Sequence, residues 1–212
     1  MKLAEAQEGP TTKLGVAVLD KASGTVSYNG KPLELEKDTV EVASGVFIMA
    51  IKRGDKWAIR AWDSQAPTLT GFRGIDWFPY SSAARVEAKW VPYAEPKKVQ
   101  IPNILGDLED NVAIGLAEFE WEGTVQQLEP VVEDDALFLM FRDHTSTTGA
   151  TYGSGRFLSV DMPSADGKVV LDFNRSRNPP CAFTAFATCQ IPPRNNWLKV
   201  SIEAGSRKHG GH

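Results

Sequence analysis

The 212-residue chain has no long apolar run. Its longest ones, residues 46–51 and 136–141, suit a buried strand and fall far short of the roughly 20 residues that a membrane helix needs. The N-terminal residues are acidic and lack the apolar stretch of a signal peptide. We therefore expect a cytoplasmic protein that has no membrane partner and whose thiols are kept reduced.

An excess of basic residues is also missing. The 23 Lys and Arg face 27 Asp and Glu, which gives a net charge of −4 and no overall attraction to nucleic acid. The charge is unevenly placed, however. Residues 99–141 hold ten acids and no Lys, Arg or His, whereas residues 142–212 hold nine Lys or Arg against five acids. We expect no nucleic-acid partner, and we expect the two segments to present differently charged faces.

Cysteine and histidine are scarce, with two and three residues. Cys181 and Cys189 are eight positions apart, which is not the short spacing of a zinc knuckle, and His144 is the one histidine outside the glycine-rich C-terminus. We therefore predict no metal site and two free thiols. The chain also lacks a G-x-S-x-G elbow, a phosphate loop, an H-E-x-x-H motif and a dinucleotide fingerprint, so no cofactor can be assigned.

What the sequence has in abundance is strand patterning. Asn29-Gly30 between apolar residues predicts a tight hairpin, and Glu122-Gly123 predicts another between two apolar stretches. A third hairpin is expected around residues 53–55, and residues 84–90 alternate as in a half-buried strand. A short helix is expected before Pro10. Further strands are expected at 136–142, 156–161, 168–173 and 197–202.

The chain leaves no room for the long crossover helices of a doubly wound α/β fold. We predict an all-β protein with few short helices, built as an antiparallel barrel or as a two-sheet sandwich, because open strand edges invite aggregation. The Pro, Gly and aromatic residues of 64–80 mark a boundary. They predict an N-terminal β unit of residues 1–66 and a main β domain of residues 67–212, unless the two form one continuous domain.

Two stretches of the C-terminal third concentrate polar chemistry. Residues 141–145 follow a buried apolar run and place Asp143 where the chain surfaces, and residues 151–156 set Tyr152 and Arg156 among glycines. Glycines let backbone amides approach an anion, and Arg offers a bidentate donor fork. In the second stretch, residues 171–183, two consecutive prolines stiffen a loop that carries further polar groups. These groups are Asp172, Asn174, Asn178 and Cys181.

Our leading hypothesis is that a small polar or anionic ligand binds where the two stretches meet. Arg156 would hold the anion and Asp143 and Asp172 would orient Arg156. Neutral hydrogen bonds would come from Tyr152, Asn174 and Asn178.

Four other interpretations stay open. In one, the charged groups only pair with each other as a structural device. In another, Cys181 is a nucleophile or redox thiol, with His144, Arg175 and Arg177 as the available activating groups. The motif could also serve an architecture whose function lies in protein partners. The fourth alternative is a flavin-binding split barrel.

The same stretches carry a resemblance. The chain resembles the bacterial domain-of-unknown-function family 1684 through FRDHTSTTGATYGSGRFL (141–158), LDFNRSRNPPCAF (171–183) and ATCQIPPRNNWLKVSIEAG (187–205). GIDWFP (74–79) and EFEWEG (118–123) match more weakly. The resemblance implies a C-terminal unit whose family motif includes Asp143, Tyr152, Arg156, Asp172, Asn174, Asn178, Cys181 and Cys189, whereas Arg177 stands where the family tends to have an aromatic residue. It brings no accepted activity, substrate or cofactor.

Overall fold

The computed structural model describes residues 17–20, 25–53 and 56–210. The chain forms two compact units, residues 1–73 and 74–212. The division lies between Arg73 and Gly74, within the boundary stretch 64–80 and a few residues beyond the expected position at residue 66. The short helix expected before Pro10 lies outside the described residues.

The first unit contains two three-stranded antiparallel sheets, with the orders β1-β2-β3 and β4-β5-β6. The Asn29-Gly30 hairpin is confirmed: it joins β2 to β3, and both residues have positive φ, 48° and 80°. The hairpin around residues 53–55 is confirmed as the pairing of β5 with β6. The strands are β1 (Ala17–Asp20), β2 (Thr25–Tyr28), β3 (Lys31–Leu33), β4 (Thr39–Ala43), β5 (Val46–Arg53) and β6 (Lys56–Asp63).

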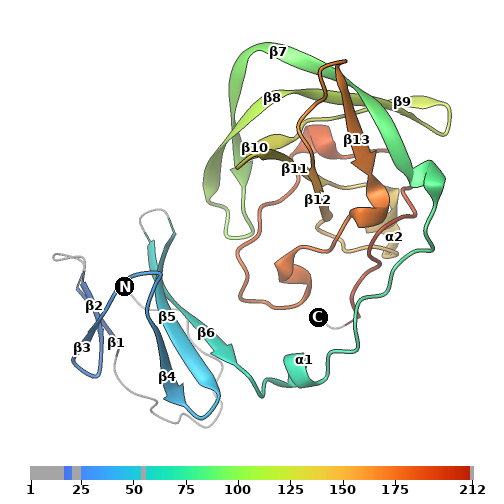
Figure 1. Cartoon of the computed structure of the whole chain (residues 1–212). Coiled ribbons are helices and arrows are strands. Elements are labelled where there is room, and N and C mark those ends of the chain that lie inside the picture. Colours follow the sequence, from blue (N-terminus) through green and yellow to red (C-terminus); the bar gives the residue numbers. More distant parts are fainter. Residues whose placement is uncertain (1–16, 21–24, 54–55, 211–212) are drawn as a thin grey trace. The chain divides into compact units, whose positions relative to one another are not determined.

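The second unit contains a four-stranded sheet, β13-β7-β8-β9, and a three-stranded sheet, β10-β11-β12, both antiparallel. The long strands β7 and β8 curl over the smaller sheet, so that the two sheets form a half-barrel (Figure 1). This arrangement confirms the all-β prediction. A half-barrel of two sheets is intermediate between the two predicted architectures, the closed barrel and the sandwich. The strands are β7 (Arg85–Pro102), β8 (Leu108–Trp121), β9 (Thr124–Leu128), β10 (Val131–Glu133), β11 (Ala136–Phe141), β12 (Arg156–Val160) and β13 (Lys168–Asp172).

The core of this unit is the space between the two sheets. Residues that alternate along β7 and β8 point into it, as period-two patterning predicts, and β11 is buried along nearly its whole length. Phe173 lies at the centre of an aromatic cluster with Phe119, Trp121 and Phe141, at ring-centroid distances of 5.4 to 5.7 Å.

Helices are few and short. None of those in the described part of the chain has the length and apolar content that a membrane crossing requires. The α-helices are α1 (Pro67–Thr70) and α2 (His144–Thr148), and the 3-10 helices are η1 (Ser82–Ala84), η2 (Phe173–Arg175), η3 (Pro180–Ala182) and η4 (Arg194–Asn196).

The strand predicted at residues 197–202 is wrong. This stretch opens what we call the C-terminal tail, residues 197–210, which runs along the half-barrel without joining a sheet. It makes a single parallel bridge, between Trp197 and Arg142, and an antiparallel bridge between Ser206 and Trp77. Alternating apolar residues thus mark one buried side of the tail without a ladder of strand pairing.

Candidate functional site

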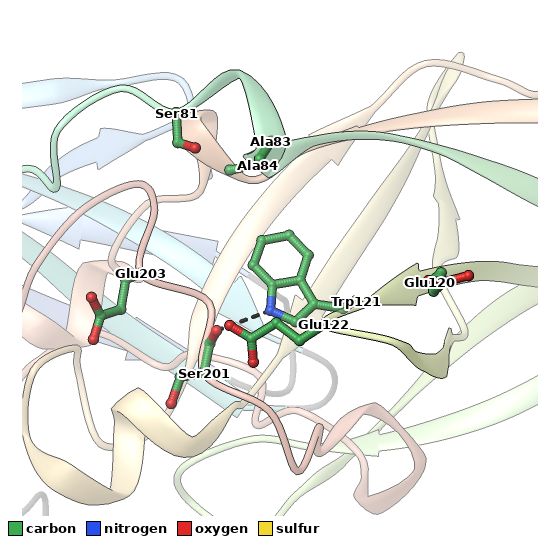
Figure 2. A pocket seen from close by; sticks show the side chains of 8 residues that line it. All are labelled: Ser81, Ala83, Ala84, Glu120, Trp121, Glu122, Ser201 and Glu203. Atoms are coloured by element: carbon green, nitrogen blue, oxygen red, sulfur yellow. Dashed lines mark hydrogen bonds between the residues drawn. The ribbon is translucent and has the colours of Figure 1, made fainter.

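A hollow of about 560 Å³ is lined by residues of η1, the end of β8 and the tail (Figure 2). Glu120, Glu122 and Glu203 bring three carboxylates to it, and none of the three forms an ion pair within the described residues. The indole N–H of Trp121 donates to the carbonyl oxygen of Ser201 at 3.1 Å. Three like charges repel an anion, so this hollow does not suit the anionic ligand expected from the sequence.

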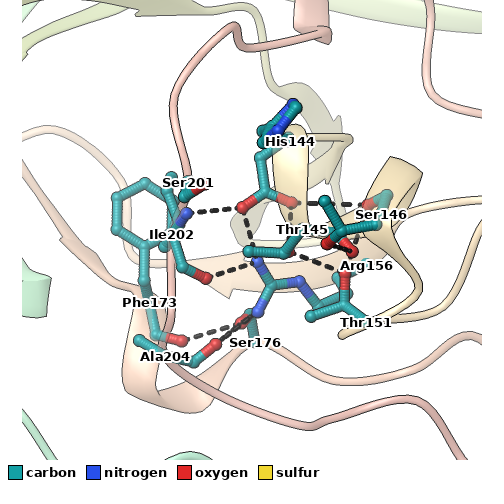
Figure 3. Close-up of polar contacts among 12 residues, drawn as sticks. His144, Thr145, Ser146, Thr151, Arg156, Phe173, Ser176, Ser201, Ile202 and Ala204 are labelled. Carbon is teal, nitrogen blue, oxygen red and sulfur yellow. Dashed lines mark hydrogen bonds and ion pairs between the residues drawn. The ribbon is translucent and has the colours of Figure 1, made fainter.

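Arg156, the first residue of β12, is fully buried. Its Nη2 donates to Oδ2 of Asp143 at 3.1 Å and to the carbonyl oxygen of Ile202 at 2.9 Å. Its Nη1 donates to the carbonyl oxygen of Ala204 and, at 3.4 Å, to Oγ of Ser176 (Figure 3). Burial lowers the pKa of Arg156, and the charge of Asp143 opposes that shift. The guanidinium therefore ties β12 to the tail.

The carboxylate of Asp143 is equally occupied. Besides Arg156, its Oδ2 accepts the backbone N–H of Ile202 at 2.6 Å, and its Oδ1 accepts the hydroxyl of Thr145 at 2.7 Å. Thr151 extends the network through a hydroxyl contact of 2.8 Å with Thr145 (Figure 3). The structure thus brings Asp143 and Arg156 together, as expected, but in a sealed network with the backbone of the tail. This geometry supports the structural interpretation of the pair.

Asp172 does not contact Arg156. Its Oδ1 accepts the backbone N–H of Asn174 at 3.2 Å and the side-chain Nδ2 of Asn174 at 2.9 Å. Asn174 in turn pairs with the backbone of Ser81 in both directions, at 3.0 and 2.8 Å. These two residues therefore fasten the segment before β7 to the end of β13. The expectation that Asp172 orients Arg156 is corrected accordingly.

Asn178 is buried, and its Nδ2 donates to the carbonyl oxygen of Arg207 at 2.8 Å. Its Oδ1 has no hydrogen-bond partner and is inaccessible to solvent. The side chain thus holds the far end of the tail. Asn174 and Asn178 both donate to backbone carbonyl oxygens, and neither forms a hydrogen bond with Arg156.

Tyr152 contacts neither Arg156 nor Asp143 through a hydrogen bond. It lies instead beside the thiol pair, which is Cys181 and Cys189. Both cysteines are free and buried, 8% and 6% exposed, within one apolar cluster. The backbone N–H of Cys181 donates to Sγ of Cys189 at 3.1 Å, and the Tyr152 hydroxyl donates to the Cys181 carbonyl oxygen at 3.1 Å. The loop between the two cysteines therefore places the Cys189 sulfur beside the backbone of Cys181.

The two thiols differ in acidity. The adjacent Cys189 thiol lowers the pKa of Cys181 to about 6, against the opposing effect of burial. The pKa of Cys189 is raised, first because its proton is held by Cys181 and second because it is buried. Burial and the contact with Cys181 also raise the pKa of Tyr152. The pKa of Cys181 is thus the lower of the two. His144, Arg175 and Arg177 are not among the groups that shift its pKa.

Within the described residues, no three His, Cys, Asp or Glu side chains lie close enough to hold a metal ion. The two cysteines lack the further ligands that a tetrahedral site needs.

A second polar centre was not singled out from the sequence. Glu129 is 6% exposed and accepts hydrogen bonds from Lys97 at 2.8 Å, from Asn195 at 2.6 Å and from the hydroxyl of Tyr93. Burial raises the pKa of Glu129, but these hydrogen bonds outweigh it and the pKa is lowered. Asn196 is fully buried, and its side chain accepts a hydrogen bond from the backbone N–H of Glu129 and donates one to its carbonyl oxygen. Glu129 stands among apolar residues in the sequence, and its partners are up to 67 positions away. Its role as a polar centre could therefore not be predicted from the neighbouring residues.

The chain matches the family described as "Protein of unknown function (DUF1684)" over residues 70–207 and belongs to it. This range contains every candidate residue named above. A solved structure with a similar fold is the NMR structure of the uncharacterized protein from gene locus rrnAC0354 of Haloarcula marismortui. It is 28% identical, has a TM-score of 0.55, and the match covers 68% of this chain and 80% of that one. No match is found among curated proteins.

Proposed function

We propose that the second unit is a thiol redox domain in which Cys181 is the reacting thiolate and Cys189 the resolving thiol. The observation that carries the proposal is the proximity of the two cysteines: the backbone N of Cys181 lies 3.1 Å from Sγ of Cys189, and the neighbouring Cys189 thiol lowers the pKa of Cys181. A thiolate is the nucleophilic form of cysteine, and a neighbouring thiol is what resolves its oxidised product.

The reaction would take a hydroperoxide as the oxidant. The Cys181 thiolate attacks the outer peroxide oxygen, the O–O bond breaks, and the leaving alkoxide or hydroxide takes a proton from solvent. Cys181 is then a sulfenic acid. The Cys189 sulfur next attacks the Cys181 sulfur, and hydroxide leaves with the Cys189 proton as water. The dithiol has lost two electrons to the peroxide, and two equivalents of an external thiol would restore it by successive disulfide exchange, leaving as their own disulfide.

The burial of the pair limits the oxidant to a small molecule. Both thiols are less than a tenth exposed, and a buried structural cysteine is ordinarily inert. Between the two cysteines Phe186 is 96% exposed, whereas Ala182 is buried and Ala187 packs against the apolar cluster, so only a small opening at the exposed side of this loop is needed. A hydrogen peroxide molecule needs far less opening than a protein disulfide does.

The proposal is tested by titrating the reduced full-length chain with hydrogen peroxide and following its mass. We expect the loss of two hydrogen atoms and a Cys181–Cys189 disulfide in the peptide map. The variant Cys189→Ser should stop at a sulfenic acid that dimedone traps on Cys181, whereas Cys181→Ser should give no adduct. Equal reactivity of the two cysteines, or no disulfide at peroxide levels that oxidise exposed methionines, would sink the proposal.

The pH dependence of alkylation supplies an independent control. Because the neighbouring Cys189 thiol lowers the pKa of Cys181, the reaction of Cys181 with iodoacetamide should have its midpoint below the ordinary thiol value of roughly 8.5. Cys189→Ala removes that thiol, so the midpoint should move up. A midpoint that stays in place would show that Cys189 does not act on Cys181.

A further inference from the structure

Trp197 lies between two arginines at the start of the tail. The guanidinium carbon of Arg142 is 4.4 Å from the centre of its ring and that of Arg194 is 4.1 Å from it. The backbone fixes this arrangement, because Arg142 bonds to both neighbours of Trp197, donating to Asn196 at 3.0 Å and accepting from Leu198 at 2.8 Å. The indole N–H donates to the carbonyl oxygen of Pro192 at 2.9 Å. The aromatic ring therefore holds two cations in set positions.

The charges of these arginines are not neutralised. In the parts of the chain that the structure describes, the side chains of Arg142, Arg194 and Lys199 make no ion pair and no hydrogen bond. A guanidinium stacked on an aromatic face keeps its N–H groups available at its edge. The nearby carboxylate of Glu129 is already neutralised by Lys97 at 2.8 Å. Among the described residues, the charges of Arg142, Arg194 and Lys199 are therefore not paired with a carboxylate.

A hollow of about 380 Å³ lies beside this cluster. Trp197 and Lys199 line it, together with amide side chains, which are donors of the kind that accompany a charge-assisted contact. Two of these amides already donate one hydrogen bond each, Asn195 to Glu129 and Gln127 to Glu118, and an amide nitrogen has a second N–H to offer. The remaining lining residues are Val125, Gln126 and Leu198.

We propose that this hollow binds a small oxyanion, meaning a molecule that carries a phosphate or carboxylate group. Lys199 supplies a charge from the lining, Arg194 supplies a second one from its position stacked on the lining residue Trp197, and Asn195 and the glutamines supply neutral donors. The site is distinct from the thiol pair and does not depend on its chemistry. It differs from the Arg156 site expected from the sequence in one decisive respect: its cations are reachable and unpaired, whereas Arg156 is sealed.

The test uses the full chain and NMR of the six indole N–H groups, with the Trp197 signal assigned by its loss in Trp197→Phe. Pyrophosphate and citrate are titrated separately at constant ionic strength, so that the two oxyanion sources are distinguished. We expect the Trp197 signal to shift and saturate with at least one of them while the other five indoles do not move. Affinity should fall roughly tenfold in Arg194→Ala and in Lys199→Ala, because each removes one charge-assisted contact.

The matched control is Arg175→Ala, which removes an exposed arginine of η2 that is not over Trp197. It should leave the titration unchanged. The proposal is overturned if neither anion gives a saturable shift of Trp197. It is equally overturned if Arg175→Ala weakens the shift as much as Arg194→Ala, because the effect would then be one of overall charge. Arg175, Arg194 and Lys199 are exposed, so their three alanine variants should melt as the parent does.

Discussion

At the scale of single residues, Arg156 is the side chain of the second unit whose burial costs the most free energy. A fully buried guanidinium is tolerated only where its N–H groups find acceptors, and here a carboxylate, two carbonyl oxygens and a hydroxyl provide them. Its Nε remains without a partner, so even this network is incomplete. The pair specifies where the tail lies, because two of the four acceptors, Ile202 and Ala204, are backbone groups of the tail.

Replacing Arg156 with Met should therefore lower the free energy of unfolding by roughly 3–5 kcal/mol, because Asp143 is left buried without its cation. The double variant Arg156→Met with Asp143→Asn should lose less than the sum of the two single changes, since neither charge is then uncompensated. Chemical denaturation of the four proteins measures this coupling. Normal melting of Arg156→Met would contradict the structural role and return Arg156 to the list of ligand-binding candidates.

The sequence placed Asp143 and Arg156 in one site, and that much holds. It gave no indication that the site is closed, because the closing groups are the backbone of residues 202–204, and backbone polarity has no sequence signature. Trp197 and its two arginines were missed for a similar reason. Arg142 and Arg194 are 52 positions apart, and only the bridge between Arg142 and Trp197 brings them to one ring.

At the scale of elements, local turn chemistry was the most dependable guide. Glu122 and Gly123 have φ of 50° and 76° and join β8 to β9 as the sequence predicts. The strand predicted at residues 84–90 is in fact the long β7, which continues to Pro102 through a register shift between Pro92 and Lys97. The second half of β7 was not predicted because its prolines and charges are untypical of a strand. They are compatible with one here, since prolines are tolerated at irregularities of strand pairing.

The tail is held by close backbone packing at Gly205, which has φ of 78°. A Cβ added there would lie 2.5 Å from the carbonyl oxygen of Ser176 and 2.7 Å from that of Phe173, both backbone atoms that cannot move aside. Gly205→Ala should therefore destabilise the protein by roughly 3 kcal/mol or more, through left-handed strain and overpacking together.

Gly123→Ala is the matched control for this change. Gly123 has nearly the same φ, 76°, but nothing within 4 Å of an added Cβ, so it carries the backbone strain alone. We expect a loss of about 1–2 kcal/mol. Thermal melting of both variants separates the two effects, and equal losses would show that the tail does not pack closely at Gly205.

At the scale of the whole molecule, the family match and the second compact unit nearly coincide, residues 70–207 against 74–212. This unit contains the main apolar core and both the thiol pair and the Trp197 hollow. The first unit has its own small cluster around Val26, Leu33 and Ala50. The family's shared properties therefore belong to the second unit.

A chain that starts at residue 70 should accordingly fold by itself. We expect a dispersed NMR spectrum, one cooperative thermal transition and the same rate of Cys181 alkylation as in the full chain, because the contacts of the pair come from within the second unit. The full chain is the reference for each measurement. An unfolded or aggregating fragment would mean that residues 1–69 contribute to its stability.

The sequence by itself determined the β class, the hairpins at Asn29-Gly30 and Glu122-Gly123, and the family, because period-two patterning, turn residues and motifs are local properties of the chain. Only the tertiary structure decided which polar residues are sealed and which are reachable. Arg156 and Arg194 look alike in the sequence, yet one is buried under the tail and the other is exposed over an indole ring. That difference is set by segments distant along the chain, whose packing determines the solvation of each charge.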